Sequence, residues 1–280
     1  MPIIDFILNL VGLLLWVSWR SAWLDPLATS RPATLVGTVR RAEPQPWVRW
    51  QFLLGLASLL FFRAVLYWQI GPAADWTPTL NLGAITLSFR SDLFLRVLAF
   101  SVASFVLMVA SFYFFLLFLS AVNGPGPEAE PVQKLVRFHL GWLDRWPWLI
   151  KLLLPFLLMA GLWLLLLPLV YDLQIVPRPS SVSHRFEQAG TIGLGVYLNW
   201  KYLITGFLAF YTLSSYVFIG EHPFWGFITV SSRRMLTPFR LLPLRIGKVD
   251  FAPLIAIALT VVAAQYAERG LTALYRRLPI

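Results

Sequence analysis

The chain has 280 residues, of which 58% are hydrophobic and only 13% are charged. A soluble domain carries about 25% charged residues, so this composition excludes an ordinary water-soluble fold. The formal charge of +10 is spread over the connectors and forms no separate basic domain, which argues against nucleic-acid binding, and the absence of cysteine excludes disulfides and thiolate chemistry.

Long apolar runs recur along the whole chain, and a membrane-crossing helix needs about 20 mostly apolar residues. The runs predict six spans, at residues 3–23, 47–70, 93–122, 148–171, 193–220 and 251–268. Polar connectors rich in proline or glycine, such as 24–46, 71–88 and 172–192, separate them. The first run lacks a basic start and a clean cleavage site, so we expect a retained helix. These features predict an all-α, polytopic transmembrane helix bundle.

Two segments between the spans are amphipathic, at residues 131–147 and 223–240. In the first, Val132, Leu135, Val136 and Leu140 are expected to share one face. Both segments also carry tryptophan, which is typical of the membrane interface. We therefore predict two interfacial helices that lie on the bilayer surface and contact anionic lipids.

The basic residues are unevenly distributed among the connectors. The connectors after the first, third and fifth spans are rich in arginine and lysine, whereas the connector after the second is poor in them. The positive-inside rule then places the odd-numbered connectors in the cytoplasm and both termini outside, although the basic C-terminus opposes this orientation.

The second half of the chain repeats the pattern of the middle. Residues 93–156 and 193–259 each read as an apolar span, a Gly/Pro stop, an amphipathic basic helix, a turn with proline and another apolar span. Internal repeats of helix pairs are common in membrane folds. The predicted organisation is an N-terminal membrane segment at 1–92, a first helix-pair repeat at 93–171 and a second at 172–280.

The second repeat carries a series of turn and helix-start residues. They are Pro223, Phe224, Pro238, Arg240, Pro243, Gly247, Asp250 and Pro253. This series resembles the signature of the YggT family of small bacterial and plastid membrane proteins, with Tyr216 and Ala252 where the family has tryptophan and serine. The resemblance implies a helix-pair fold in a bacterial cytoplasmic (inner) membrane. It also implies roles such as those of plastid members in cytochrome complex maturation and thylakoid organisation.

Asp250 and Pro253 also have a physical interpretation without the family. A carboxylate just before a span accepts hydrogen bonds from free amides at the helix N-terminus, and proline is tolerated in the first turn. We expect Asp250 to start a helix, and an ion or substrate site there is the alternative.

The sequence contains no recognisable catalytic, phosphate-binding or metal-binding motif. His139, His184 and His222 are isolated, and polar anchoring is favoured over metal or haem ligation. We therefore expect no catalytic residues, no cofactor and no metal. Arg63 is the one charge well inside a predicted span, where it is paired, functional or, as we favour, snorkelling to the interface. No acidic residue is predicted deep inside a span, which counts against transport.

The surplus of interfacial surface and the lack of reactive groups favour a non-enzymatic membrane scaffold or biogenesis factor. Such a protein would have other membrane protein subunits as partners and would support the assembly of a larger complex. Two alternatives stay open, a permanent accessory subunit of a respiratory or photosynthetic complex and a small-solute channel or transporter. A membrane enzyme is the least favoured class.

Overall fold

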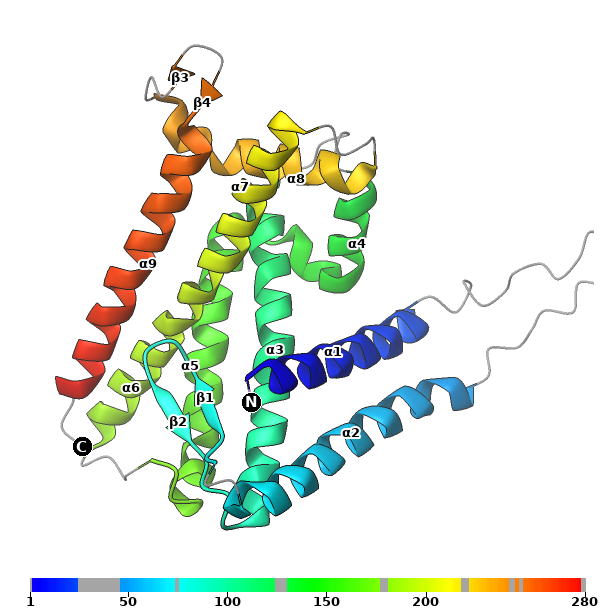
Figure 1. Ribbon diagram of the computed structural model, residues 1–280, viewed down its shortest axis with the longest axis vertical. Coiled ribbons are helices and arrows are strands. Elements are labelled where there is room, and N and C mark those ends of the chain that lie inside the picture. The colour runs from blue at the N-terminus through cyan, green and yellow to red at the C-terminus, as the bar shows by residue number, and fades with distance from the viewer. Residues whose placement is uncertain are drawn as a thin grey trace, which may run out of the picture. The chain divides into compact units, whose positions relative to one another are not determined.

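The computed structural model describes residues 2–24, 46–73, 76–123, 130–176, 181–217, 222–241, 245–246 and 249–277 (Figure 1). Its main helices are α1 (Pro2–Leu24), α2 (Pro46–Ala73), α3 (Phe94–Val122), α4 (Glu130–Leu140), α5 (Trp148–Asp172), α6 (Val182–Gly195), α7 (Trp200–Tyr216), α8 (Pro223–Met235) and α9 (Ala252–Arg277). Short 3-10 helices are η2 (Gly141–Arg145), η3 (Val196–Asn199) and η4 (Thr237–Leu241). The strands β1 (Thr79–Asn81) and β2 (Thr86–Ser88) form one hairpin, and β3 (Arg245–Ile246) and β4 (Val249–Asp250) form another.

Five of the described helices are long and apolar enough to cross a bilayer. They cover Ile3–Ser21, Trp50–Gly71, Phe94–Val122, Trp148–Asp172 and Ala252–Arg276. The composition and these five helices define a multi-pass membrane protein. The predicted span at 193–220 is not one long helix in the structure, because the 3-10 turn η3 separates the end of α6 from α7, which has 17 residues.

One other expectation about local structure was wrong. Residues 172–192 were predicted as a connector, yet α6 already begins at Val182, where the hydroxyl of Ser181 accepts from the amide of His184. In α4, Val136 and Leu140 are buried within the protein, whereas Leu135 is 56% exposed. The connector at 24–46 lies almost entirely outside the described residues.

The chain divides into two compact units, and the boundary falls within α3. Unit 1 comprises residues 1–80 and 88–110, and unit 2 comprises residues 81–87 and 111–280. In unit 1, α1 and α2 run side by side (Figure 1). Gly12 of α1 faces Phe105 of α3 so closely that a Cβ atom would come 3.0 Å from its ring. The small residue therefore lets α1 approach α3.

In unit 2, α5 packs along α6, and α7 packs along α9 (Figure 1). The amphipathic helix α8 rests on α7 through its buried face, where Phe227 packs with Leu119 and Phe207. The hydroxyl of Ser232, also on this face, donates to the carbonyl of Phe207 at 3.0 Å. The predicted amphipathic helix thus has one face fixed against an apolar helix.

The tip of the β1–β2 hairpin belongs to unit 2 and lies against the end of α6. Gly83 has a φ of +84°, and its amide donates to the side chain of Asn81 at 2.7 Å. A Cβ on Gly83 would come 2.6 Å from the carbonyl oxygen of Gly195, and a Cβ on Gly195 would come 2.6 Å from the carbonyl oxygen of Leu82. Thr272 of α9 donates to the carbonyl of Ala84 at 3.2 Å. Two glycines are therefore needed where the hairpin meets the helix.

We predict that Gly195→Ala destabilises the protein by about 1–3 kcal/mol, because the new methyl group collides with hairpin backbone that has no room to move. The control is Gly190→Ala in the same helix, where nothing lies within 4 Å of an added Cβ. That substitution should stabilise the helix by about 0.5–1 kcal/mol. Thermal unfolding in detergent, followed by tryptophan fluorescence, measures both. Equal shifts for the two variants would contradict the packing described here.

Candidate functional site

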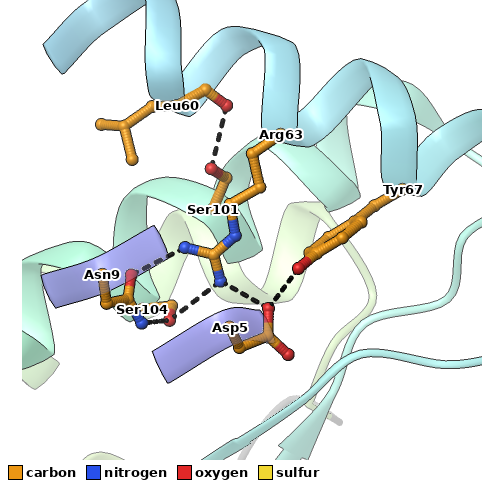
Figure 2. Close-up of polar contacts among 7 residues, drawn as sticks. All are labelled: Asp5, Asn9, Leu60, Arg63, Tyr67, Ser101 and Ser104. Carbon is orange, nitrogen blue, oxygen red and sulfur yellow. Dashed lines mark hydrogen bonds and ion pairs between the residues drawn. The ribbon is translucent and has the colours of Figure 1, made fainter. Parts of the chain in front are cut away.

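The Arg63 side chain lies inside the span formed by α2, and only 1% of it is exposed. Its Nη1 donates to Oδ1 of Asn9 at 2.7 Å, and its Nη2 donates to Oδ1 of Asp5 at 2.9 Å and to the hydroxyl of Ser104 at 3.2 Å (Figure 2). These partners come from α1 and α3. The guanidinium therefore turns inward between three helices, and the expectation that it snorkels to the interface was wrong.

The carboxylate of Asp5 is the counter-ion of Arg63. Its Oδ1 also accepts a hydrogen bond from the hydroxyl of Tyr67 at 2.7 Å, as Figure 2 shows. Asp5 lies in the first turn of α1, where the helix dipole favours a negative charge. The rings of Tyr67 and Phe100 have their centroids 5.5 and 5.2 Å from the guanidinium carbon. Opposite charge, aromatic faces and hydrogen bonds together offset the cost of desolvating the arginine.

We call Asp5, Asn9, Arg63, Tyr67 and Ser104 the arginine cluster. The amide of Asn9 is used at both ends, because its Nδ2 donates to Ser104 at 2.7 Å while its Oδ1 accepts from Arg63. Beside the cluster, Ser101 donates to the carbonyl of Leu60 at 2.9 Å, which adds a link between α3 and α2. Among the described residues, Nε of Arg63 is the one fully buried side-chain nitrogen or oxygen of the cluster that has no hydrogen-bond partner. The arrangement is closed and nearly saturated, so its first effect is to lock three helices together.

Sequence reasoning identified Arg63 but not its partners. Asp5 and Asn9 are spaced i, i+4 in an apolar run, which places both on one face of a helix. That spacing was the available signal. No acidic residue was expected deep inside a span, and Asp5 is the third residue of the candidate span Ile3–Ser21, from where its carboxylate reaches Arg63.

A second polar cluster, in unit 2, joins Ser120, Arg137, Asp144 and Lys151. Lys151 is 7% exposed, and its Nζ donates to the hydroxyl of Ser120 at 2.7 Å and to the backbone carbonyl of Asp144 at 2.5 Å. The Asp144 carboxylate accepts from Ser120 at 2.5 Å and from Nε of Arg137 at 3.0 Å. We call this the lysine cluster. It ties η2 and α4 to the ends of α3 and α5.

A neutral link joins the end of α3 to α8. The side chain of Asn123 donates to the hydroxyl of Ser231 at 2.7 Å, and both residues are buried. Gln133 of α4 donates to the backbone carbonyl of Asn123 at 3.4 Å. Both amphipathic helices are therefore anchored by buried hydrogen bonds to one point at the end of an apolar helix.

The charges at the start of α3 form a partly exposed motif, in which the side chain of Asp92 is 47% exposed and that of Arg96 is 9% exposed. Asp92 accepts from the amide of Leu93 and from Nη1 of Arg96, both at 3.0 Å. Slight burial raises the pKa of the Asp92 carboxyl, but Arg96 and the Leu93 amide outweigh this effect and hold the pKa below its usual value. The stabilisation is therefore present above the usual pKa of an aspartate and is lost on acidification through the lowered value. Because the side chain is half exposed, the contribution is small.

The structure places the motif residues of the second repeat at helix starts and turns. Pro223 and Phe224 open α8, Pro238 and Arg240 lie in η4, and Pro253 lies in the first turn of α9. The carboxylate of Asp250 accepts from the amide of Ala252 at 3.0 Å, which is the contact that a helix start requires. Pro243 and Gly247 lie outside the described residues. The motif thus shapes the entry into a span, and its residues do not join either polar cluster in the part of the chain described.

The three histidines lie apart. The His139 ring is buried, and its Nδ1 lies 3.0 Å from the carbonyl of Leu135. His184 pairs with Glu187 at 3.0 Å, and His222 caps α8 by accepting from the amide of Phe224. Among the described residues, no group of three or more His, Asp or Glu side chains could hold a metal ion.

Comparisons with protein families, with curated proteins and with solved structures find no match for this chain. The class that the fold and the clusters define is a multi-pass helical membrane protein in which the buried Arg63 of unit 1 is paired with Asp5 across helices. The resemblance to the YggT family stays a prediction.

Replacing Arg63 by methionine should destabilise the protein by about 3 kcal/mol, because the carboxylate of Asp5 loses its counter-ion in a desolvated position. The control is Arg90→Met, since 76% of the Arg90 side chain is exposed and its nitrogen lies 3.9 Å from Asp92. That change should cost less than about 1 kcal/mol. Thermal unfolding in detergent distinguishes the two. Combining Arg63→Met with Asp5→Asn should recover part of the loss, and strictly additive effects would contradict direct pairing.

The substitution Asp144→Asn keeps the size of the side chain but leaves Lys151 and Arg137 without their counter-ion. We expect a loss of about 2 kcal/mol, below the cost of a fully broken buried pair because Ser120 and a backbone carbonyl still accept from Lys151. Amide hydrogen exchange in α4 and η2 should accelerate. Glu187→Gln, on a carboxylate whose side chain is 45% exposed, is the control and should change neither quantity. Unchanged exchange in Asp144→Asn would show that the lysine cluster does not hold these elements.

Proposed function

We propose that this protein is a non-enzymatic integral membrane scaffold or biogenesis factor that supports the assembly or organisation of a larger membrane protein complex. The proposal rests on where the polar and the apolar side chains of the protein lie, inside the helix bundle or on its outer surface. The charged groups of unit 1 within the bundle face one another across helices, whereas most of the apolar surface of the candidate spans faces outward. Such a division suits a protein that presents fixed helix faces to neighbours.

The outward surface is largest on two helices. Only 11% of the apolar window of α1 and 6% of that of α9 are buried within the chain. Leu14 of α1 and Tyr266 of α9 are 59% and 69% exposed, and Leu165 of α5 is 76% exposed. In a bilayer these faces are available both to lipid and to the helices of other proteins, which associate there through packing and hydrogen bonds.

We infer that α4 and α8 lie at the membrane interface and that α6, η3 and α7 together complete a sixth crossing. The support is that α4 and α8 each bury one face against apolar helices and keep Arg137 and Arg233 on the exposed side. Interfacial helices of this kind contact anionic head groups. The proposed location is a bacterial cytoplasmic membrane, as the YggT resemblance implies.

A permanent accessory subunit is a variant of the same proposal, distinguished by fixed stoichiometry in a purified complex. Transport is the second candidate function, and the arginine cluster is the specific observation that favours it. A carboxylate, an arginine and a tyrosine meet inside the bundle, which is a combination used for ion or proton relays. The saturation of its hydrogen bonds favours a structural role instead.

The scaffold proposal predicts direct protein neighbours on the exposed faces. A photo-crosslinking residue is placed at Leu14, Leu165 or Tyr266 in the native membrane, and at the buried Leu208 as the control. At least one exposed position should give a discrete protein adduct that the control does not give. Deleting the protein should lower the amount of the adducted partner's assembled complex by more than half.

Lipid adducts alone at every exposed position, with unchanged levels of all membrane complexes after deletion, would refute the scaffold proposal. Flux assays in liposomes test the second candidate. Robust solute or proton flux that Asp5→Asn abolishes, in a variant that still folds, would replace scaffolding by transport.

A further inference from the structure

A groove of about 690 Å³ runs between η3–α7 and α9 in unit 2. Ile204, Ala263, Ala264, Ala267 and Leu271 are among its apolar walls, and Lys201 is the one charged residue among the described residues that line it. The volume falls within the range of small-molecule sites, about 300–1,000 Å³.

The surroundings of the groove are those of a lipid-facing surface. Its α9 wall extends from Thr260 to Leu274, about 21 Å at 1.5 Å per residue. The hydrocarbon core is about 30 Å thick and one leaflet about 15 Å deep, so the wall is longer than one leaflet and too short to cross the whole core. Since an unfilled apolar groove forfeits dispersion contacts, a hydrocarbon chain of a lipid is the occupant that its walls favour.

The charged side chains beside the groove determine which lipid head group is favoured. Nζ of Lys201 lies 3.3 Å from Oε2 of Glu268, and these side chains are 21% and 41% exposed. Arg269 and Arg276 follow Glu268 on α9 but line a separate cavity, so Lys201 is the positive group that the described lining of this groove offers. The partly exposed ammonium of Lys201 is complementary to a phosphate that carries a full negative charge.

Trp200 gives an independent indication of a polar ligand. It lines the groove, and its buried Nε1–H has no acceptor among the described residues. Its ring is held by Phe118 and Tyr197, with centroids 4.7 and 4.8 Å away. A buried donor without an acceptor is costly, and the ester carbonyl of a glycerolipid supplies one.

We propose that the groove between α7 and α9 binds one acyl chain of an anionic glycerophospholipid, with its phosphate beside Lys201. The Lys201–Glu268 pair then regulates affinity, because Glu268 competes with the phosphate for the lysine. This site is independent of the scaffold function.

The test uses the full chain in mild detergent and measures lipid binding by native mass spectrometry. The probes are dioleoyl phosphatidylglycerol and dioleoyl phosphatidylcholine, which share the same acyl chains. Phosphatidylglycerol should bind about fivefold more tightly, the effect of one basic residue near an anionic lipid. Lys201→Gln should abolish this preference, Lys201→Arg should keep it, and Glu268→Gln should strengthen it.

The groove itself is tested by filling it. Gly270 lines the groove and Gly206 of α7 does not, and nothing lies within 4 Å of a Cβ added at either glycine. Gly270→Leu should weaken binding of both lipids at least fivefold, whereas Gly206→Leu should leave it unchanged.

Three outcomes overturn the proposal. One is equal binding of the two lipids by the wild type. Another is an equal loss of thermal stability in Lys201→Gln and Glu268→Gln without change in lipid preference, which marks a purely structural ion pair. The third is displacement of a second copy or a protein partner, and not of lipid, by Gly270→Leu.

Discussion

A positive charge inside a membrane-spanning helix constrains everything packed around it. Arg63 cannot be left facing hydrocarbon, and at 1% exposure its side chain does not reach the surface. It therefore requires acceptors from neighbouring helices, and α1 supplies Asp5 and Asn9 while α3 supplies Ser104. Each acceptor fixes the rotation of its helix, because a turn of even one residue position, about 100°, would carry the side chain away from the guanidinium. Apolar packing alone would leave these rotations poorly determined, since lipid and leucine are equally apolar.

Unit 2 solves the same problem with different residues. Lys151, Asp144 and Ser120 bring a short 3-10 helix against two apolar helices, and Asn123 with Ser231 fixes α8 through neutral hydrogen bonds. Elsewhere the backbone itself sets the constraint. The tip of the β1–β2 hairpin approaches α6 at Gly195, and the carbonyl of Ala84 in this tip accepts a hydrogen bond from Thr272. The non-helical backbone of the hairpin is therefore covered by protein. Buried hydrogen bonds and close backbone contacts at glycine therefore fix the positions of helices, which apolar packing alone would leave undetermined.

This distinction explains what the sequence could and could not predict. Five spans and the helix start at Asp250 follow from local signals, namely apolar length and capping residues. The beginning of α6 was missed because it falls in a polar segment without a hydropathy signal, and its cap at Ser181 is an ordinary serine. The partners of Arg63 were missed because Asp5 lies 58 residues away and only the folded helix rotations bring them together. The break at η3 was missed because Val196–Asn199 reads as a continuation of an apolar helix.

The ion pairs of the chain differ in how completely protein covers them, and this difference bears on function. Asp5–Arg63 and Asp144–Lys151 are mostly enclosed and have additional hydrogen bonds, so they need nothing from outside the chain. Lys201–Glu268 is 21% and 41% exposed, beside a groove with apolar walls. A partly covered ion pair at the edge of hydrocarbon is more stable when another polar group forms hydrogen bonds with its charges. These hydrogen bonds offset part of the free energy that desolvation of the charges costs. The enclosed pairs therefore hold the helices of this protein together, whereas the charges of Lys201 and Glu268 are accessible to groups outside the chain.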